Sequence, residues 1–260
     1  MTRELQQTSP TARIAAISWT GGKDCNLALL RSWRNSNLNV KYLLTFRPEG
    51  KQFHAHPIRV MEGQASALGL ELIFVTIPTD TTDYMQAYID GTKKIQQEHG
   101  IQVVVTGDMD LVGTMDRNWI ERCCERVGGD MKCDLPLWNA NREECLEELL
   151  REGFEIIFSC VKSPFFDGNW INRVLDQATL AELKRMADKG LTDEQIQSGL
   201  KPLDLCGERG EYHTMVVNGP IYSSKVAIDS NDVPHMEERQ SKWKGNIHNA
   251  DRIWTISLKN

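Results

Sequence analysis

The fold of this chain is decided by one stretch of sequence, Ile14–Trp33, which reads IAAISWTGGKDCNLALLRSW. The stretch begins with a short apolar run, Ile14–Ile17, which stops abruptly at the turn residues that follow Ser18. After the turn, apolar residues recur every three or four positions, which is the spacing of an amphipathic helix. The stretch therefore predicts a buried strand, a glycine turn and the start of a helix.

The two adjacent glycines, Gly21 and Gly22, predict a site for an anion. Glycine lets the main chain come close to a ligand, and the helix start adds unpaired N–H groups and the positive end of the helix dipole. Lys23 adds a positive charge, while Thr20 and Cys25 flank the turn. Such groups bind phosphate. The spacing is neither that of a Walker loop nor that of a dinucleotide fingerprint, so a turn that only connects two elements stays open as the alternative.

Length and composition limit the class of protein. A chain of 260 residues is long enough for one large domain or two small ones. The formal charge of −6 argues against a protein that coats nucleic acid, so no nucleic-acid partner is expected. No apolar run approaches the roughly 20 residues that span a bilayer, and residues 1–13 lack a signal-peptide core, so no membrane partner is expected.

Seven cysteines, an odd number without a CxxC pair, bear on metal binding and location. Zinc and iron–sulfur sites usually need such pairs, so no metal ligands are expected among the cysteines. Free cysteines are typical of a reducing compartment, and we expect a cytoplasmic location.

Strand-like and helix-like segments alternate through the first half. Beyond the opening unit, strands are expected at 40–46, 70–77 and 101–106, and helices at 58–68, 83–99 and 116–127. This alternation predicts an α/β fold with a doubly wound parallel sheet. Ligands of such sheets bind beyond the carboxyl ends of the strands, where the glycine turn, Phe46–Arg47 and Gly107–Asp108 would lie.

The pattern loosens after Gly128–Gly129. A strand or turn is expected at 135–138, a helix at 142–152, a strand at 154–161, a helix near 179–189, and a glycine-rich turn that leads into a strand at 206–217. We therefore expect one domain over residues 1–130 and a smaller α/β domain over residues 131–260.

The turn as a whole, Thr-Gly-Gly-Lys-Asp-Cys at residues 20–25, resembles the Ser-Gly-Gly-x-Asp-Ser pyrophosphate loop of the N-type ATP pyrophosphatases (PP-loop enzymes), which cleave ATP to AMP and pyrophosphate. Thr20 keeps the hydroxyl of the first serine, whereas Cys25 replaces the last serine with a weaker donor. The resemblance implies a Rossmann-like fold of the adenine nucleotide alpha hydrolase type for the first domain.

The second half resembles one family of this group. Cys-Gly-Glu-x-Gly-Glu-Tyr-x-Thr, residues 206–214, resembles the signature of the diphthine–ammonia ligase family, also called diphthamide synthetases. Further matches follow in the family's order, at Arg47–Pro48, Arg117-x-Trp119-x-Glu121, Pro136–Trp138, Arg173-x-Leu175-Asp176 and Gly219–Tyr222. The resemblance covers residues 13–229.

The resemblance implies an ATP-dependent ligase. The family activates the carboxylate of diphthine, a modified histidine on translation elongation factor two, as an acyl-adenylate, and ammonia then displaces AMP. It therefore implies ATP with Mg²⁺ as cofactor, elongation factor two as the protein partner and ammonium as the nitrogen donor.

The resemblance also implies roles for individual residues. The ATP-binding residues would be Ser18, Thr20, Gly21, Gly22, Lys23, Asp24, Cys25, Thr45, Phe46, Gly107 and Asp108. Lys23 would stabilise the departing pyrophosphate, and Asp24 would either cap the helix or help to hold Mg²⁺. Glu208 and Glu211, which both face the cleft if their turn is helical, would be catalytic and would bind ammonium or take a proton from it. The alternative for this pair is two solvated loop carboxylates.

The substrate-binding residues that the resemblance implies are Arg117, Glu121, Arg173, Asp176 and His213. Arg117 and Glu121 lie at i and i+4, so an ion pair across one helical turn is the alternative for them. His54 and His56 could approach the nucleotide, but two histidines in a loop are more often polar surface.

Two other functions stay open. One is a PP-loop adenylating enzyme that acts on a different carboxylate or on a nucleobase; the missing CxxC pair argues against thiolation and the acidic composition against tRNA. The other is a nucleotide-sensing module without catalysis, which would keep residues 20–25 but would have no reason for a carboxylate-rich loop at 206–214.

Overall fold

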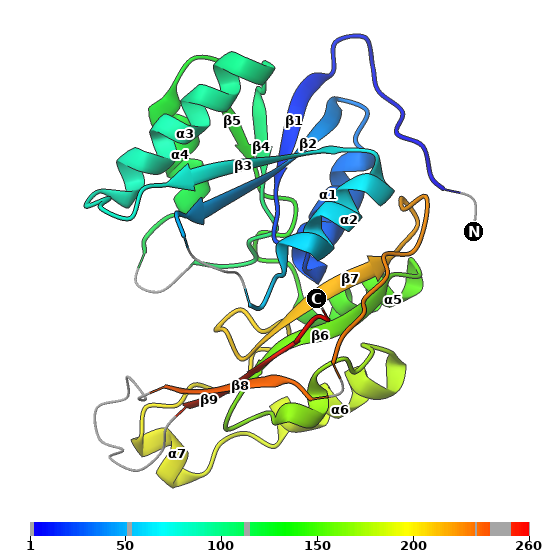
Figure 1. The fold of residues 1–260 in the computed structure, drawn as a ribbon, viewed down its shortest axis with the longest axis vertical. Helices are drawn as coiled ribbons and strands as arrows, with labels where there is room; N and C mark the ends of the chain where they lie inside the picture. The colour runs from blue at the N-terminus through cyan, green and yellow to red at the C-terminus, as the bar shows by residue number, and fades with distance from the viewer. Residues whose placement is uncertain (1–2, 51–53, 112–114, 232, 240–250, 260) are drawn as a thin grey trace.

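A computed structural model describes residues 3–50, 54–111, 115–231, 233–239 and 251–259, and it contains two sheets (Figure 1). The first sheet has the strand order β3-β2-β1-β4-β5, and all its neighbouring strands are parallel. Its strands are β1 (Arg13–Ser18), β2 (Leu38–Pro48), β3 (Glu71–Ile77), β4 (Val103–Val105) and β5 (Lys132–Asp134). The order reverses between β1 and β4, and such a switch point is where doubly wound sheets bind ligands. The predicted doubly wound α/β fold is confirmed.

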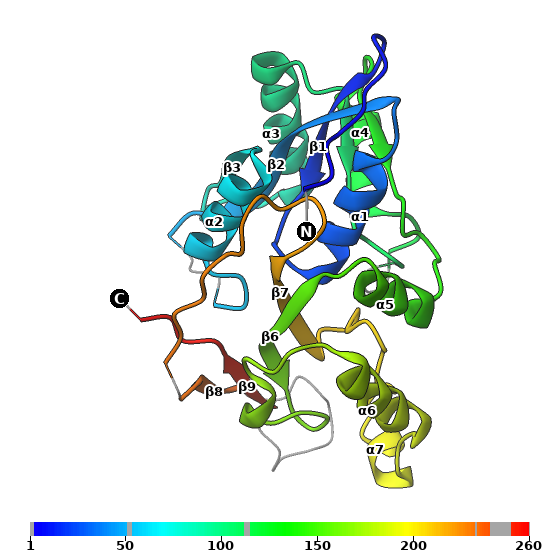
Figure 2. The same ribbon diagram turned by 90° about the vertical axis from the view of Figure 1, so that its right-hand side faces the viewer.

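Four helices cover the two faces of this sheet: α1 (Lys23–Trp33), α2 (Ile58–Leu68), α3 (Tyr84–His99) and α4 (Trp119–Val127). Figures 1 and 2 show α1 and α2 on the face toward the second sheet, and α3 and α4 on the opposite face. Successive residues of β1 point to opposite faces, because Ala15 and Ile17 belong to the core under α1, whereas Ala16 packs under α3 and α4.

Caps explain where these helices begin and end. Gly69 and Gly100 follow α2 and α3 in the left-handed conformation, at φ +64° and +65°, which glycine adopts without steric cost. The side chains of Asp83 and Asn118 cap α3 and α4 and lie outside them. For this reason α3 begins one residue, and α4 three residues, later than expected from the sequence.

The strand β5 has no counterpart among the strands expected from the sequence. It pairs with β4 from Val103–Lys132 to Val105–Asp134, so the first sheet continues past residue 130. The division of the chain at 130 stays a prediction.

The second sheet has the order β7-β6-β9-β8, and its neighbouring strands are antiparallel. Its strands are β6 (Glu155–Lys162), β7 (Tyr212–Asn218), β8 (His235–Arg239) and β9 (Asp251–Thr255), accompanied by α5 (Arg142–Arg151), η1 (Gly168–Trp170), α6 (Gln177–Asp188) and α7 (Asp193–Gln197). The predicted smaller second α/β unit is confirmed, and residues 135–138 contribute a turn to it.

The two sheets share one apolar core. Trp19 and Leu29 of the first unit belong to the same buried cluster as Phe158, Tyr212 and Met215 of the second. Figures 1 and 2 both show β7 beside α1 and α2, so the glycine turn before α1 lies at the junction of the two units.

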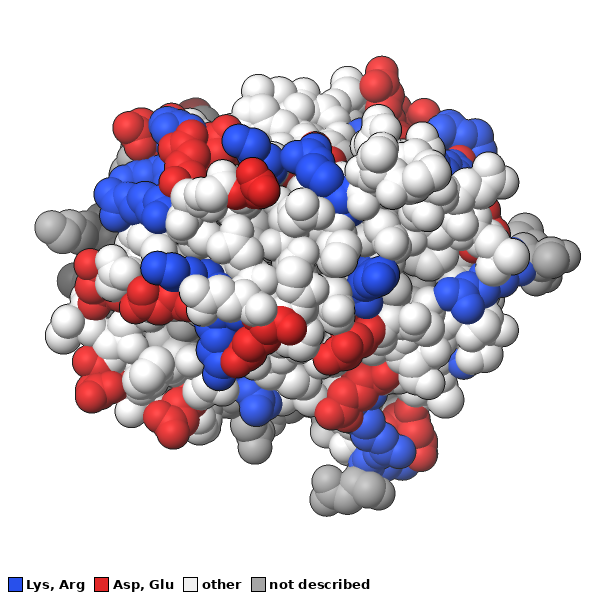
Figure 3. Space-filling view, turned by 90° about the horizontal axis from the view of Figure 1, so that it is seen from above, with Lys and Arg blue, Asp and Glu red and all other residues white. Residues whose placement is uncertain are grey.

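Surface charge and the length of apolar helices are the features that concern nucleic-acid and membrane partners. On the face seen in Figure 3, acidic and basic side chains lie beside each other and do not gather by sign. Among the described residues, no helix combines the length and the apolar character needed to cross a membrane.

Candidate active site

The glycine turn between β1 and α1 is held by contacts from distant parts of the chain. The carbonyl of Gly21 accepts hydrogen bonds from the N–H of Val216 on β7 (3.0 Å) and from Nε2 of Gln64 on α2 (2.9 Å). The N–H of Lys23 donates to Oγ1 of Thr214 at 3.1 Å. The shape of the turn is thus set jointly by α2 and by the second sheet.

Two buried amides, Gln64 and Asn26, complete this frame, and the sequence analysis did not single them out. Nδ2 of Asn26 donates to the carbonyl of Gly22 at 2.8 Å, and Oδ1 of Asn26 accepts from the hydroxyl of Tyr222 at 2.7 Å. In the structure, each of these amides is 0% exposed. The signal that could have identified them in the sequence is an amide at a helix position that faces the core.

Only glycine fits at position 21. Gly21 has φ +80°, and a Cβ there would lie 2.3 Å from Oε1 of Gln64. Gly107, which follows β4, also leaves no room for a side chain, because a Cβ added there would lie 2.7 Å from the main-chain carbon of Asp24. Gly107 thereby brings the end of β4 against the first turn of α1.

The start of α1 has no capping side chain in its own turn, and the hydroxyl of Thr214 binds only the N–H of Lys23 among the described residues. The N-cap of α1, Gly22, supplies no capping side chain, and Asp24 does not cap the helix, since its Oδ2 accepts from Nζ of Lys23 at 2.8 Å. Thr20 is exposed beside this turn. The N-terminal N–H groups of a helix that lacks a capping side chain are suited to a phosphate.

Cys25 occupies the position at which the motif has its last serine. It is buried, and its thiol donates to the carbonyl of Gly22 at 3.2 Å. Burial raises the pKa of Cys25 to about 11, so the thiol is neutral at physiological pH.

The side chain of Lys23 points to the second sheet. It is 2% exposed, and its ammonium contacts Asp24, the carbonyl of Cys206 and the face of the Tyr212 ring. Burial alone would lower the pKa of Lys23, but the nearby carboxylate of Asp24 and smaller contributions outweigh it, and the pKa lies well above its ordinary value. Lys23 is therefore a fixed positive charge at the junction.

A cavity of about 320 Å³ opens beside the turn at the carboxyl ends of β1, β2 and β4. Its lining consists of Ser18, Trp19, Thr20, Leu44, Thr45, Phe46, His56, Met61, Tyr88, Thr106, Asp108, Met115, Trp119 and Ile120. The structure thus brings together five of the predicted ATP-binding residues, namely Ser18, Thr20, Thr45, Phe46 and Asp108. Their role in binding stays a prediction.

An aromatic group lines one side of this cavity. The rings of Phe46 and Tyr88 stack at 4.1 Å between centroids, and Tyr88 meets Trp119 edge-on at 5.7 Å. Flat aromatic surfaces of this kind suit a flat heterocycle such as a base. The sequence analysis predicts neither Tyr88 nor Trp119 as a lining residue of this cavity, because neither carries a local ligand-binding pattern.

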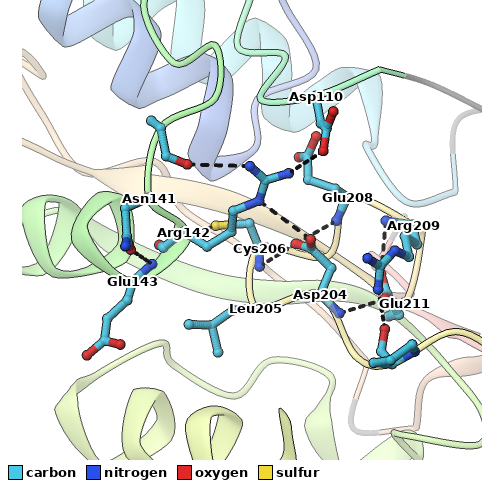
Figure 4. A network of polar contacts seen from close by, with 12 residues as sticks. Asp110, Asn141, Arg142, Glu143, Asp204, Leu205, Cys206, Glu208, Arg209 and Glu211 are labelled. Carbon is cyan, nitrogen blue, oxygen red and sulfur yellow. Dashed lines mark hydrogen bonds and ion pairs between the residues drawn. The ribbon is translucent and has the colours of Figure 1, made fainter. Parts of the chain in front are cut away.

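The loop 204–211, whose Cys206 carbonyl accepts a hydrogen bond from Lys23, is held by a polar network (Figure 4). Arg142 on α5 lies within ion-pair distance of Asp110, at 3.3 Å, and of Asp204, at 3.5 Å. Oδ1 of Asp204 accepts from the N–H of Cys206 at 2.9 Å. Arg142 therefore joins the loop after β4 to the signature loop of the second unit.

The two carboxylates predicted to be catalytic occupy different environments. Glu211 is 7% exposed, and its two oxygens accept the N–H groups of Asp204, at 2.8 Å, and Arg209, at 3.0 Å. Glu208 is exposed and donates only its main-chain N–H to the network, to Asp204. The turn is not helical, so the condition under which the sequence predicted a shared face is not met, but both residues still line the same cavity.

Glu208 borders a second cavity, of about 630 Å³, whose lining includes Lys162, Phe165, Lys201, Arg209 and Asp251. The pKa of Glu208 is raised to about 7, first because protein atoms around the carboxyl desolvate it and second because Asp24 repels its charge; Lys23 acts in the opposite direction. A carboxyl group with this pKa can exchange a proton near neutral pH.

Four of the five predicted substrate-binding residues make contacts with residues that are close to them in sequence. Arg117 pairs with Glu121 at 3.1 Å and with Glu125 at 2.5 Å on the surface of α4, which is the alternative that the i, i+4 spacing allowed. Arg173 lies over the Trp170 ring and contacts Glu182, and Asp176 caps α6 through the N–H of Thr179. These four line neither of the two cavities as far as the described residues show, and their binding role stays a prediction.

His213, the fifth, lies on β7 and meets His56 with ring centroids 5.1 Å apart. His56 lines the smaller cavity, whereas His54 is exposed and faces His235. The described part of the chain contains no group of three or more His, Cys, Asp or Glu side chains arranged to hold a metal ion.

Comparisons with known proteins cover both units. Residues 13–132 match the family model described as diphthamide synthase N-terminal domain, and residues 141–253 match the diphthamide synthase C-terminal domain. Proteins named diphthine–ammonia ligase are similar to this chain, among them one from Homo sapiens, which is 22% identical over 245 residues, 85% of this chain and 84% of the human protein.

Other relatives with this name are matched over a smaller share. The protein from Bos taurus is 22% identical over 142 residues, and that from Schizosaccharomyces pombe is 28% identical over 142 residues, 54% of this chain in each case. The match spans only 47% of the bovine and 21% of the yeast protein. A solved structure, titled as a predicted subunit of tRNA methyltransferase from Methanocaldococcus jannaschii, aligns with 82% of this chain and all of its own, at 14% identity and a TM-score of 0.38, and at that score it carries no argument.

Proposed function

The chain belongs to the diphthamide synthase family, and on this premise we propose that it is an ATP-dependent ligase that amidates a carboxylate with ammonia. The carboxylate attacks the α-phosphorus of ATP, a bond to its oxygen forms, and the bond to the departing pyrophosphate breaks. Ammonia then attacks the acyl carbon of the acyl-adenylate, AMP leaves, and a proton is lost from nitrogen. The acceptor that best fits the family name is diphthine on translation elongation factor two.

The observation that carries this proposal is that Lys23 lies close to two sites. Its main chain belongs to the turn beside the aromatic cavity, and its ammonium contacts the carbonyl of Cys206 in the loop that carries Glu208. Two successive reactions on one carboxyl group require such neighbours, because ammonia must reach the acyl group that ATP has activated.

ATP fits the first of these sites. Phe46 and Tyr88 offer a flat surface to the base, and the uncapped start of α1, together with Gly21 and Gly22, offers N–H groups to the pyrophosphate. Lys23 adds positive charge beneath the same turn. Mg²⁺ bound with ATP would neutralise part of the triphosphate charge, and Asp24 is the carboxylate of this turn that could take part in holding it.

Glu208 fits the second site as the group that handles ammonia. A carboxylate attracts ammonium, and one with a pKa of about 7 can also accept the proton that nitrogen must lose. Glu211 supports this role from within the loop, because its two hydrogen bonds hold the main chain on either side of Glu208.

The larger cavity beside Glu208 suits the acceptor side chain. It is bordered by Lys201 and Arg209, cations that attract a carboxylate, and by the ring of Phe165. We propose that residues 1–130, together with β5, bind ATP and that residues 131–260 receive the acceptor. Because elongation factor two works in the cytoplasm, we place the reaction there.

The test is product analysis. The chain is incubated with ATP, Mg²⁺, ammonium and diphthine-bearing elongation factor two, the nucleotides are separated by chromatography and the acceptor is weighed by mass spectrometry. We expect AMP and pyrophosphate in equal amounts and an acceptor that is lighter by about one mass unit, because –OH is replaced by –NH₂.

The control is the same protein with unmodified histidine, which should yield neither product. ADP as the product would contradict the proposal. AMP formed only with another carboxylate would favour the runner-up, a PP-loop adenylating enzyme with a different substrate, and ATP binding without turnover on any carboxylate would favour a sensing module.

A further inference from the structure

Two histidines from opposite halves of the chain meet at the edge of the nucleotide cavity. His56 precedes α2 and lines the cavity, and His213 lies on β7, whose neighbouring residue Thr214 binds the N–H of Lys23. Their rings are 5.1 Å apart and inclined at 75°. The pair therefore lies beside the cavity and close to the glycine turn.

The ring of His56 has an unused polar atom. Its Nδ1 is buried and has no hydrogen-bond partner among the described residues. An unpaired buried nitrogen is costly unless a ligand or a rearrangement supplies a partner. Its position beside the cavity makes the ligand the natural source of this partner.

The charged groups that face the pair are Lys23 and Asp24. His56 faces His213, the ammonium of Lys23 and the main chain of Thr20; His213 also faces Lys23 and Asp24. Burial, followed by His213 and Lys23, lowers the pKa of His56 to about 3, and burial followed by Lys23 lowers that of His213. At neutral pH both imidazoles are uncharged, and a further positive charge here is unfavourable until an anion enters.

We propose that His56 and His213 together bind the phosphate groups of ATP and so join the two halves of the chain around the nucleotide. The inference rests on the proposed function, because it needs ATP in the adjacent cavity. Imidazole N–H groups donate to phosphate oxygens, and a polyanion favours the charged form of any imidazole that it contacts. ATP binding should therefore draw protons onto this pair.

The experiment is calorimetric titration of the full chain with ATP at pH 6.5, in two buffers that differ in their enthalpy of ionisation, which counts the protons taken up. We expect His56→Gln and His213→Gln each to weaken ATP binding about tenfold or more, as loss of a hydrogen bond to a charged group does. Each variant should also take up fewer protons than the wild type. The ionisation of ATP itself is common to all titrations and cancels in this difference.

The matched control is His54→Gln. His54 is two residues from His56 but is exposed, and its ring faces His235 at 5.8 Å. This variant should bind ATP with wild-type affinity and proton uptake. Equal affinity and equal uptake in all three variants would overturn the inference while leaving the proposed function intact.

A wild-type chain that does not bind ATP would instead overturn the proposed function and this inference with it. If His56→Gln fails to fold, nitrogen NMR of the wild-type imidazoles with and without ATP decides. We expect two of the six histidines to change their ring nitrogen shifts toward those of the charged form. Unchanged shifts would overturn the inference.

Discussion

The main-chain N–H of Lys23 donates a hydrogen bond of 3.1 Å to Oγ1 of Thr214, across 191 positions of sequence. Both residues are 2% exposed, so water does not compete for this bond. It fixes the first turn of α1 against β7, and the N–H of Val216 binds the carbonyl of Gly21 beside it. The glycine turn of the first sheet therefore depends for its shape on a strand of the second.

Replacement of Thr214 should affect both stability and ATP binding. Thr214→Val keeps the shape of the side chain but leaves the buried N–H of Lys23 without an acceptor, so we expect a loss of about 1–3 kcal/mol in the free energy of unfolding. ATP affinity should fall with it, because the turn is less well held. Urea denaturation and calorimetry measure the two effects. Thr214→Ser, which keeps the hydroxyl, is the control, and a Val variant as stable as the wild type would contradict the argument.

Replacement of Gly21 by alanine should be far more harmful than the same change at Gly210. Both residues have a positive φ, +80° and +81°, so an alanine pays a similar conformational cost of about 1–2 kcal/mol at either site. A Cβ at Gly21 would in addition lie 2.3 Å from Oε1 of Gln64, whereas one at Gly210 would meet nothing within 4 Å. Thermal unfolding of the two variants should show a larger loss for Gly21→Ala, together with loss of ATP binding. Similar losses of stability in the two variants would contradict this prediction and would show that the side chain of Gln64 can move away at little cost.

The raised pKa of Glu208 predicts two pH dependences. The folded chain binds the Glu208 proton more tightly than the unfolded chain, because the pKa is about 7 against an ordinary value of 4.5. The stability that this proton contributes is complete below pH 4.5 and is lost as the pH rises to about 7. Between pH 4.5 and about 7, the free energy of unfolding of the wild type should therefore fall relative to that of Glu208→Gln. Above about pH 7, the difference between the two should stay constant.

The rate of amidation should rise with pH, whereas the stability contributed by the Glu208 proton falls. Plotted against free ammonia, the wild-type rate should rise through pH 7 as the carboxylate forms, and Glu208→Gln should be about 10²–10⁴-fold slower without this rise. Glu211→Gln is the comparison, because it should lose stability through its broken hydrogen bonds to Asp204 and Arg209. A Glu208→Gln chain that amidates at the wild-type rate would remove Glu208 from the reaction.

Local patterns of residues determined most of the fold. The alternation of apolar strands and amphipathic helices specified the doubly wound sheet, and the left-handed glycines Gly69 and Gly100 ended α2 and α3 where the sequence places them. The sequence did not predict the strand β5, because its three residues, Lys-Cys-Asp, are too few to show an alternating apolar pattern. Only their pairing with β4 makes them a strand.

The sequence by itself also predicted where a phosphate site would form, since glycine conformation and a helix start act within a few positions. Only the tertiary structure decided that the carboxylate of Glu211 holds its own loop by hydrogen bonds, that the ammonium of Lys23 is buried against Tyr212, and that His56 meets His213. These outcomes depend on contacts between residues far apart in the chain. Their geometry follows from the packing of β7 against α1 and α2, and a pattern of neighbouring residues contains no information about that packing.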